Sequence, residues 1–108
     1  MKYLFIDDIR NPFDYINSQH GDYVIEAKNY RQAIEALKDY KIDYVYFDHD
    51  LGLDKTGYDV AKYIVEHQIQ IKGFKIHSAN PVGRFNISQL MRHYGYKELS
   101  WKFKKFII

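Results

Sequence analysis

Short apolar runs alternate along this chain with segments of helical periodicity, and this alternation restricts the fold more than any other feature. The runs at residues 3–6, 43–47 and 73–77 have the length of buried strands. Residues 30–37 carry apolar side chains at positions i, i+3, i+4 and i+7, which predicts an amphipathic helix. Strands that alternate with helices favour right-handed crossovers and a mostly parallel sheet. The sequence therefore predicts a single α/β domain over residues 1–108.

Capping signals mark where the helices begin. Asn29, Thr56 and Asn80 each precede an apolar helical stripe, and each has a side-chain oxygen that can accept the free backbone N–H groups of a first turn. Gly95 fits the residue that follows the end of the third helix. Residues 8–22 lack periodicity, so we expect the first crossover to have lost its helix.

Two further strands are expected at residues 22–28 and 99–103, where apolar and polar residues alternate. With the strand order 2-1-3-4-5, the prediction is a flavodoxin-like three-layer fold whose mostly parallel sheet has five strands. Its first and last helices would be reduced or missing, since the tail at residues 104–108 is short.

Composition narrows the classes of function. The chain has no cysteine, which excludes a disulfide scaffold, a cysteine-based metal site and a cysteine nucleophile, and which fits a cytoplasmic location. Charge interrupts the apolar start at Asp7, so we expect no signal peptide, membrane span or membrane partner. Residues 1–60 hold seven basic and twelve acidic residues, whereas residues 61–108 hold nine and two. This asymmetry fits solvated faces, or a carboxylate pocket beside a basic rim that attracts phosphate.

Polar clusters follow the first, third and fourth predicted strands. In open α/β sheets, ligands bind beyond the carboxyl ends of the strands, near the switch in strand order. With the expected order these three ends are neighbours, so we expect one pocket to gather the clusters. They are Asp7-Asp8, Asp48-His49-Asp50 and His77-Ser78-Ala79-Asn80.

Asp7, Asp8 and Asp48 are the predicted metal ligands. Carboxylates side by side do not all stay ionised without a compensating cation, and hard oxygen ligands favour Mg²⁺ or Mn²⁺. Asp is also a common turn residue, so the pair Asp7-Asp8 by itself fits a turn after a strand. The expected proximity of Asp48 favours the metal site.

His49 and His77 are candidates for acid–base catalysis. Histidine exchanges protons near neutral pH, and it also serves as a metal ligand. Asp50 would then orient a histidine or complete the metal site. The competing interpretation is a pair of strand-end or solvent-facing histidines without a catalytic role.

Four residues are candidates for holding a phosphate. The Ser78 hydroxyl can donate to a phosphoryl oxygen, and the helix that begins after Asn80 would present free N–H groups to an anion. Arg10 and Arg84 could clamp the phosphate, although solvated surface arginines are an equally good explanation.

Four segments of the chain resemble the cyclic-phosphate-processing receiver-like family, which is related to response-regulator receiver domains. The resemblance covers about residues 2–95, and the segments are 4–12, 47–52, 56–60 and 77–84. It implies a receiver-like fold whose aspartate pocket acts on cyclic phosphates at nucleotide or RNA ends. It also implies metal ligation by Asp7 and Asp8, a phosphoacceptor-like Asp48 and a phosphoryl contact from Ser78. Receivers have Lys-Pro after the fifth strand, where this chain has Lys102-Phe103.

The leading hypothesis is a metal-dependent phosphoesterase whose partner is a cyclic-phosphate nucleotide or RNA end. The alternative is a non-catalytic receiver-like module that is phosphorylated, or that sequesters a nucleotide or a partner protein. The alternative would fit an origin on a phage or mobile element. A metal-dependent nuclease or Toprim-like domain ranks last, because it requires a Glu where Asp7-Asp8 stands.

Overall fold

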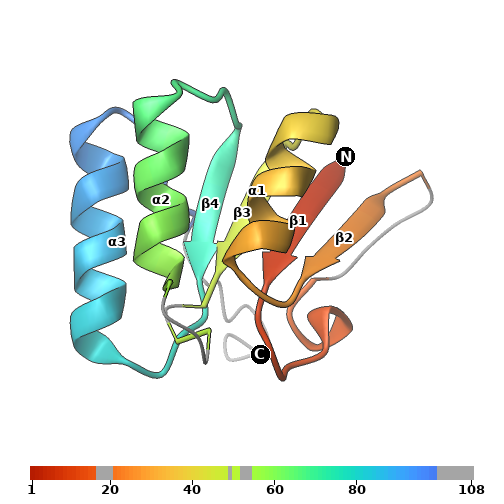
Figure 1. Cartoon of the computed structure of the whole chain (residues 1–108), viewed down its shortest axis with the longest axis horizontal. Helices are drawn as coiled ribbons and strands as arrows, with labels where there is room; N and C mark the ends of the chain where they lie inside the picture. The colour runs from red at the N-terminus through yellow and green to blue at the C-terminus, as the bar shows by residue number, and fades with distance from the viewer. Residues whose placement is uncertain (17–20, 49, 52–54, 100–108) are drawn as a thin grey trace, which may run out of the picture.

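The computed structural model describes residues 1–16, 21–48, 50–51 and 55–99. Four parallel strands form one sheet in the order β2-β1-β3-β4 (Figure 1). The α/β class and the order of the first four strands are therefore confirmed. The strands are β1 (Lys2–Ile6), β2 (Tyr23–Ala27), β3 (Tyr44–Phe47) and β4 (Gly73–Ile76), and the helices are α1 (Tyr30–Asp39), α2 (Gly57–Glu66) and α3 (Pro81–His93).

The predicted five-stranded sheet is corrected to four strands in the described part of the chain. Beside β4, Glu98 forms a single parallel bridge with Phe74, and the Leu99 N–H donates to the Phe74 carbonyl at 2.8 Å. The chain thus starts to pair where a fifth strand was expected, but the pairing at described residues is too short to form a strand. Residues 100–103 of that prediction lie outside the described residues.

The main core lies between the sheet and all three helices. Alternation along a strand sends Leu4 and Ile6 of β1 to the same face, and Val45 and Phe47 of β3 join them there. These side chains are almost fully buried against residues from α1, α2 and α3. The unbroken apolar runs that predicted strands are therefore explained, because both faces of these strands bear apolar side chains.

The opposite face of the sheet carries aromatic side chains. Tyr3, Tyr44 and Tyr46 project from β1 and β3 on this side, which we call the tyrosine face. Phe5 and Ile16 pack there too, and Ile16 comes from the crossover between β1 and β2. Among the described residues of that crossover, the short 3₁₀ helix η1 (Pro12–Asp14) is the one helical element, which agrees with the predicted loss of the first helix. Within the described ranges, no α-helix packs on the tyrosine face.

Caps begin the three helices where the sequence predicts them. The side chains of Asn29 and Asn80 each accept the backbone N–H three residues on, at 2.9 and 3.0 Å. At α2, the Thr56 backbone N–H donates to the Asp59 carboxylate at 2.7 Å. Gly95 follows α3 with a φ of +88°, a conformation that favours glycine. No helix in the described part of the chain is both long and apolar enough to cross a membrane.

Phe74 tests how far this core determines stability. Its side chain is 0% exposed, so Phe74→Ala removes a ring that packs between the sheet and the helices. We expect the free energy of unfolding to fall by about 3–5 kcal/mol in chemical denaturation. Phe85→Ala is the control, because Phe85 is 62% exposed and its loss should change stability by less than about 0.5 kcal/mol. Equal losses in the two variants would contradict this description of the core.

Candidate functional site

The strand order brings the carboxyl ends of β1, β3 and β4 together. Backbone hydrogen bonds continue beyond the strands, from Asp48 N–H to the Ile6 carbonyl at 3.0 Å and from His77 N–H to the Phe47 carbonyl at 2.9 Å. Asp7, which follows β1, donates its N–H to the Ala27 carbonyl at the end of β2. The residues just after three neighbouring strands are therefore held in register, as the sequence predicted.

Buried polar side chains gather at this edge. Among the described residues, the buried polar side chains are those of Asp7, Asp48 and Ser78, which are 1%, 4% and 4% exposed. Asp7, Asp8 and Asp48 each offer a carboxylate oxygen, and these oxygens lie within 4.8 Å of one another. The structure thus brings together the three residues that were predicted to bind a metal.

Asp7 accepts four hydrogen bonds. Its Oδ1 accepts the backbone N–H groups of Ile9 at 2.8 Å and Arg10 at 2.9 Å, while its Oδ2 accepts from Arg10 Nη1 at 3.1 Å and His77 Nε2 at 2.9 Å. Burial raises the pKa of Asp7, but the hydrogen bonds outweigh burial and hold that pKa below its usual value. Asp7 is therefore a stable carboxylate at neutral pH.

The negative charge of Asp48 is less well stabilised by hydrogen bonds than that of Asp7. Burial raises the pKa of Asp48, and the adjacent charge of Asp7 raises it further. A 3.4 Å hydrogen bond from the Asp50 N–H, the Ser78 hydroxyl and the Arg10 guanidinium at 3.5 Å oppose this rise. Asp48 is the carboxylate whose ionisation would gain most from an added cation.

Arg10 occupies the position of a counter-ion in this pocket. Its Nη1 lies 3.1 Å from Asp7 Oδ2 and 3.5 Å from Asp48 Oδ2, so one guanidinium nitrogen bridges both carboxylates. The arrangement marks a place where positive charge is favourable. Three carboxylate oxygens are also the donor type that Mg²⁺ and Mn²⁺ take. The residues present therefore fit a divalent cation, provided that the partly exposed Arg10 side chain moves aside.

His77 is enclosed by aromatic rings. Its ring stacks on Phe5 with centroids 4.6 Å apart and planes at 3°, and it lies 5.0 Å from the ring of Tyr15. The side chain is 1% exposed, and burial lowers the pKa of His77 to about 4. Because ionised Asp7 can only accept, a neutral His77 donates Nε2–H to it. Nδ1 is then an acceptor without a partner among the described residues.

The remaining predicted residues lie around this centre. Asp50 is exposed, and its Oδ1 accepts a 3.4 Å hydrogen bond from Asn80 Nδ2. Asn80 also caps α3 through Oδ1, and the Arg84 N–H donates to the Asn80 carbonyl. With Pro81 lacking an N–H, few donors at this helix start remain for an anion. Arg84 itself is exposed on α3, and His49 lies outside the described residues.

Sequence reasoning overlooked two features of this site. It assigned Arg10 to phosphate, although the spacing Asp7-x-x-Arg10 is short enough for the observed ion pair. It also did not include Phe5 and Tyr15 in the site. Strand alternation could have placed Phe5 on the face opposite Ile6, but no sequence signal brings it under His77.

The burial of His77 predicts a pH dependence of stability. The pKa of His77 is about 4 in the folded protein and 6.5 for an ordinary histidine, as in the unfolded chain. Between these pH values the unfolded chain therefore binds a proton that the folded protein does not. The contribution of neutral His77 to the free energy of unfolding is therefore fully present above pH 6.5. It falls by about 3 kcal/mol as the pH drops toward 4. Denaturant titrations without divalent cations should show this loss in the wild type and not in His77→Gln. The same slope in both proteins would contradict the assignment.

Comparison with known proteins adds independent findings. Residues 2–93 match the family described as the cyclic-phosphate processing receiver domain. No curated protein matches the sequence. Among solved structures, the chain is similar to the signal receiver domain described for a Luxo repressor protein of Vibrio parahaemolyticus, with a TM-score of 0.64 and 16% identity over 98% of this chain and 83% of the other. It is also similar to a response regulator from Thermotoga maritima, with a TM-score of 0.60 and 19% identity over 98% and 90% of the two chains.

These two likenesses concern the fold, whereas the family match spans most of the chain and includes every described residue of the acidic pocket. The chain belongs to the cyclic-phosphate processing receiver domain family.

Proposed function

We propose that this domain is a metal-dependent phosphoesterase that opens cyclic phosphates of nucleotides or RNA ends. The observation that carries the proposal is the placement of Asp7, Asp8 and Asp48 at the carboxyl edge of the sheet, with their oxygens within 4.8 Å of one another. Buried like charges that lie side by side destabilise a fold unless a bound ligand or a counter-ion neutralises them. The family description supports a cyclic phosphate as the substrate class.

The three aspartates would hold Mg²⁺ or Mn²⁺. A cation bound there would polarise the phosphoryl oxygens and lower the pKa of a bound water. Asp8 is the most available ligand, because its carboxylate has no hydrogen bond or ion pair with any other described residue. Asp7 and Asp48 would contribute the oxygens that Arg10 now bridges.

Arg10 is the residue that would exchange partners. Like charge would drive its guanidinium away from the two carboxylates once they hold a cation. The side chain is 36% exposed, so it can turn outward without breaking the core. A guanidinium released in this way suits a phosphate, which it can bind through two hydrogen bonds. Ser78, buried beside Asp48, would donate to another phosphoryl oxygen.

His77 would act as a positioning residue. It is buried and neutral, and its Nε2 is committed to Asp7, so it orients a metal ligand and does not exchange protons with substrate. His49 remains the proposed histidine for proton transfer, supported by its place directly after Asp48. Asp50, exposed beside Asn80, would help orient the reacting groups.

The hydrogen bond between His77 and Asp7 also favours a second candidate function. With one of the two histidines held by Asp7, the site resembles a phosphate-binding pocket more than a pair of acid and base. In that case the domain would be phosphorylated on Asp48, or it would sequester a nucleotide or a partner protein.

The deciding experiment is incubation of the protein with Mg²⁺ or Mn²⁺ and a panel of 2′,3′- and 3′,5′-cyclic nucleotides. We expect metal-dependent ring opening that Asp48→Asn abolishes, while Asp39→Asn at the exposed end of α1 leaves it unchanged. His77→Gln should lower activity by about 10–100-fold, the cost typical of residues that orient metal ligands. Bound but unchanged nucleotide, or labelling of Asp48 by acetyl phosphate without turnover, would replace the enzyme with the binding module.

The position of Arg10 predicts a response to the metal alone. Without a cation, Arg10→Gln leaves Asp7 and Asp48 without their shared counter-ion and should lower the free energy of unfolding by about 1–2 kcal/mol. Mg²⁺ should then raise the thermal midpoint more in Arg10→Gln than in the wild type, because it no longer competes with a guanidinium. Arg84→Gln, at an exposed position of α3, is the control and should behave as the wild type. An equal Mg²⁺ response in all three proteins would rule out competition at this site.

A further inference from the structure

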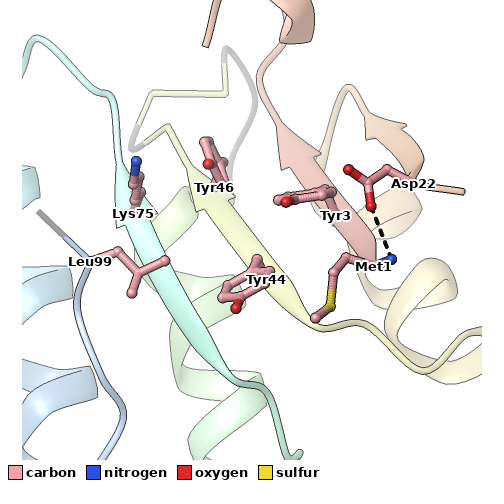
Figure 2. Close-up of a pocket in the computed structure, with 7 residues that line it drawn as sticks. All are labelled: Met1, Tyr3, Asp22, Tyr44, Tyr46, Lys75 and Leu99. Carbon is pink, nitrogen blue, oxygen red and sulfur yellow. Dashed lines mark hydrogen bonds and ion pairs between the residues drawn. The ribbon is translucent and has the colours of Figure 1, made fainter. Parts of the chain in front are cut away.

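A hollow of about 450 Å³ lies on the tyrosine face, and the residues that line it do not include the three aspartates of the acidic pocket. Figure 2 looks onto this face, with the side chains that line the hollow drawn in front of the strands. Tyr3 and Tyr44 stack with centroids 5.4 Å apart, and Tyr46 meets Tyr3 edge-on at 6.0 Å. Lys75 lies over the Tyr46 ring at 5.7 Å, and Asp22 borders the hollow beyond β1. The surface is aromatic in its centre and charged at its borders.

An aromatic sheet face of this kind normally packs against a second layer. All three α-helices of the described residues pack on the other side of the sheet, and η1 with its flanking residues reaches only the part near Phe5 and Ile16. Parallel sheets are usually covered on both faces, because their strands are apolar on both. We therefore expect another segment or molecule to cover the tyrosine face.

The end of the described chain lies at the border of this hollow. Leu99 lines it on the β4 side (Figure 2), and its N–H donates to the Phe74 carbonyl at 2.8 Å. Gly73 permits this approach, since a Cβ added there would lie 3.1 Å from Leu99 Cγ. The chain thus enters residues 100–108 from a point that is already fixed against the sheet.

Residues 100–108 have the composition and length that this face requires. They contain one tryptophan, two phenylalanines and two isoleucines, together with three lysines and no acidic residue. An extended chain advances about 3.3 Å per residue, and neighbouring strands lie about 4.8 Å apart, so the segment can reach from β4 across β3 and β1. Its lysines would then approach Asp22, which borders the far side of the hollow.

We propose that residues 100–108 dock on the tyrosine face, and that their apolar side chains fill the hollow between Leu99 and Tyr3. The segment would supply the layer that the three α-helices do not. The occupant is this chain's own tail, because it starts at the border of the hollow and needs no second molecule to reach it. This proposal does not depend on whether the acidic pocket is catalytic.

Trp101 provides the test, because it is the single tryptophan of the chain. In the 108-residue protein we expect blue-shifted emission and an acrylamide quenching constant several-fold below that of N-acetyltryptophanamide. Tyr44→Lys should shift the emission to the red and raise the quenching constant several-fold, since a charge is placed within the hollow. Tyr40→Lys is the matched control, because Tyr40 is 51% exposed at the end of α1, and it should leave the fluorescence unchanged.

Far-UV circular dichroism establishes that each variant is folded, and Tyr3→Lys replaces Tyr44→Lys if the latter is not. A tryptophan as accessible as the free model compound in the wild type would overturn the proposal. So would protection that neither face variant changes, since Trp101 would then be buried elsewhere. Protection that appears only at high protein concentration, with dimers in light scattering, would assign the face to a second copy and also overturn it.

Discussion

Asp7 and Asp48 lie buried next to each other, and the rest of the pocket is arranged around their mutual repulsion. Asp7 receives two backbone N–H groups, a guanidinium and an imidazole, while Asp48 shares the guanidinium and gains a hydroxyl. The backbone donors come from the crossover after β1, which turns at Ile9 and Arg10 instead of continuing into an α-helix. The missing first helix and the electrostatics of the pocket are thus two aspects of one local conformation.

Local signals in the sequence predict most of the fold. Apolar runs identify β1, β3 and β4, and the side chains of Asn29 and Asn80 determine where α1 and α3 begin. Such signals act within a few residues, so they can be recognised without knowledge of the rest of the fold. Of the expected fifth strand the structure describes only Leu99, and pairing with β4 at the described residues is limited to the Phe74–Glu98 bridge and the Leu99 N–H.

Sequence analysis predicted that the three carboxylates of the candidate site lie together, but it did not predict the contacts within the site. Asp7, Asp8 and Asp48 meet because a parallel sheet carries the ends of its strands to one edge. The environment of His77 depends on Phe5 from β1 and Tyr15 from the crossover, which approach it only in the folded chain. Burial by such distant residues decides whether a histidine exchanges protons or holds another residue in place, and a strand-end position alone is compatible with both.

Phe5 contacts both the acidic edge of the sheet and the tyrosine face. One face of its ring stacks on His77, which holds Asp7, and the same side chain packs against Tyr46 with centroids 6.3 Å apart. The acidic edge and the tyrosine face are therefore in contact through this buried ring. A group that packs on Tyr46 would therefore lie two ring contacts away from the imidazole that holds the Asp7 carboxylate.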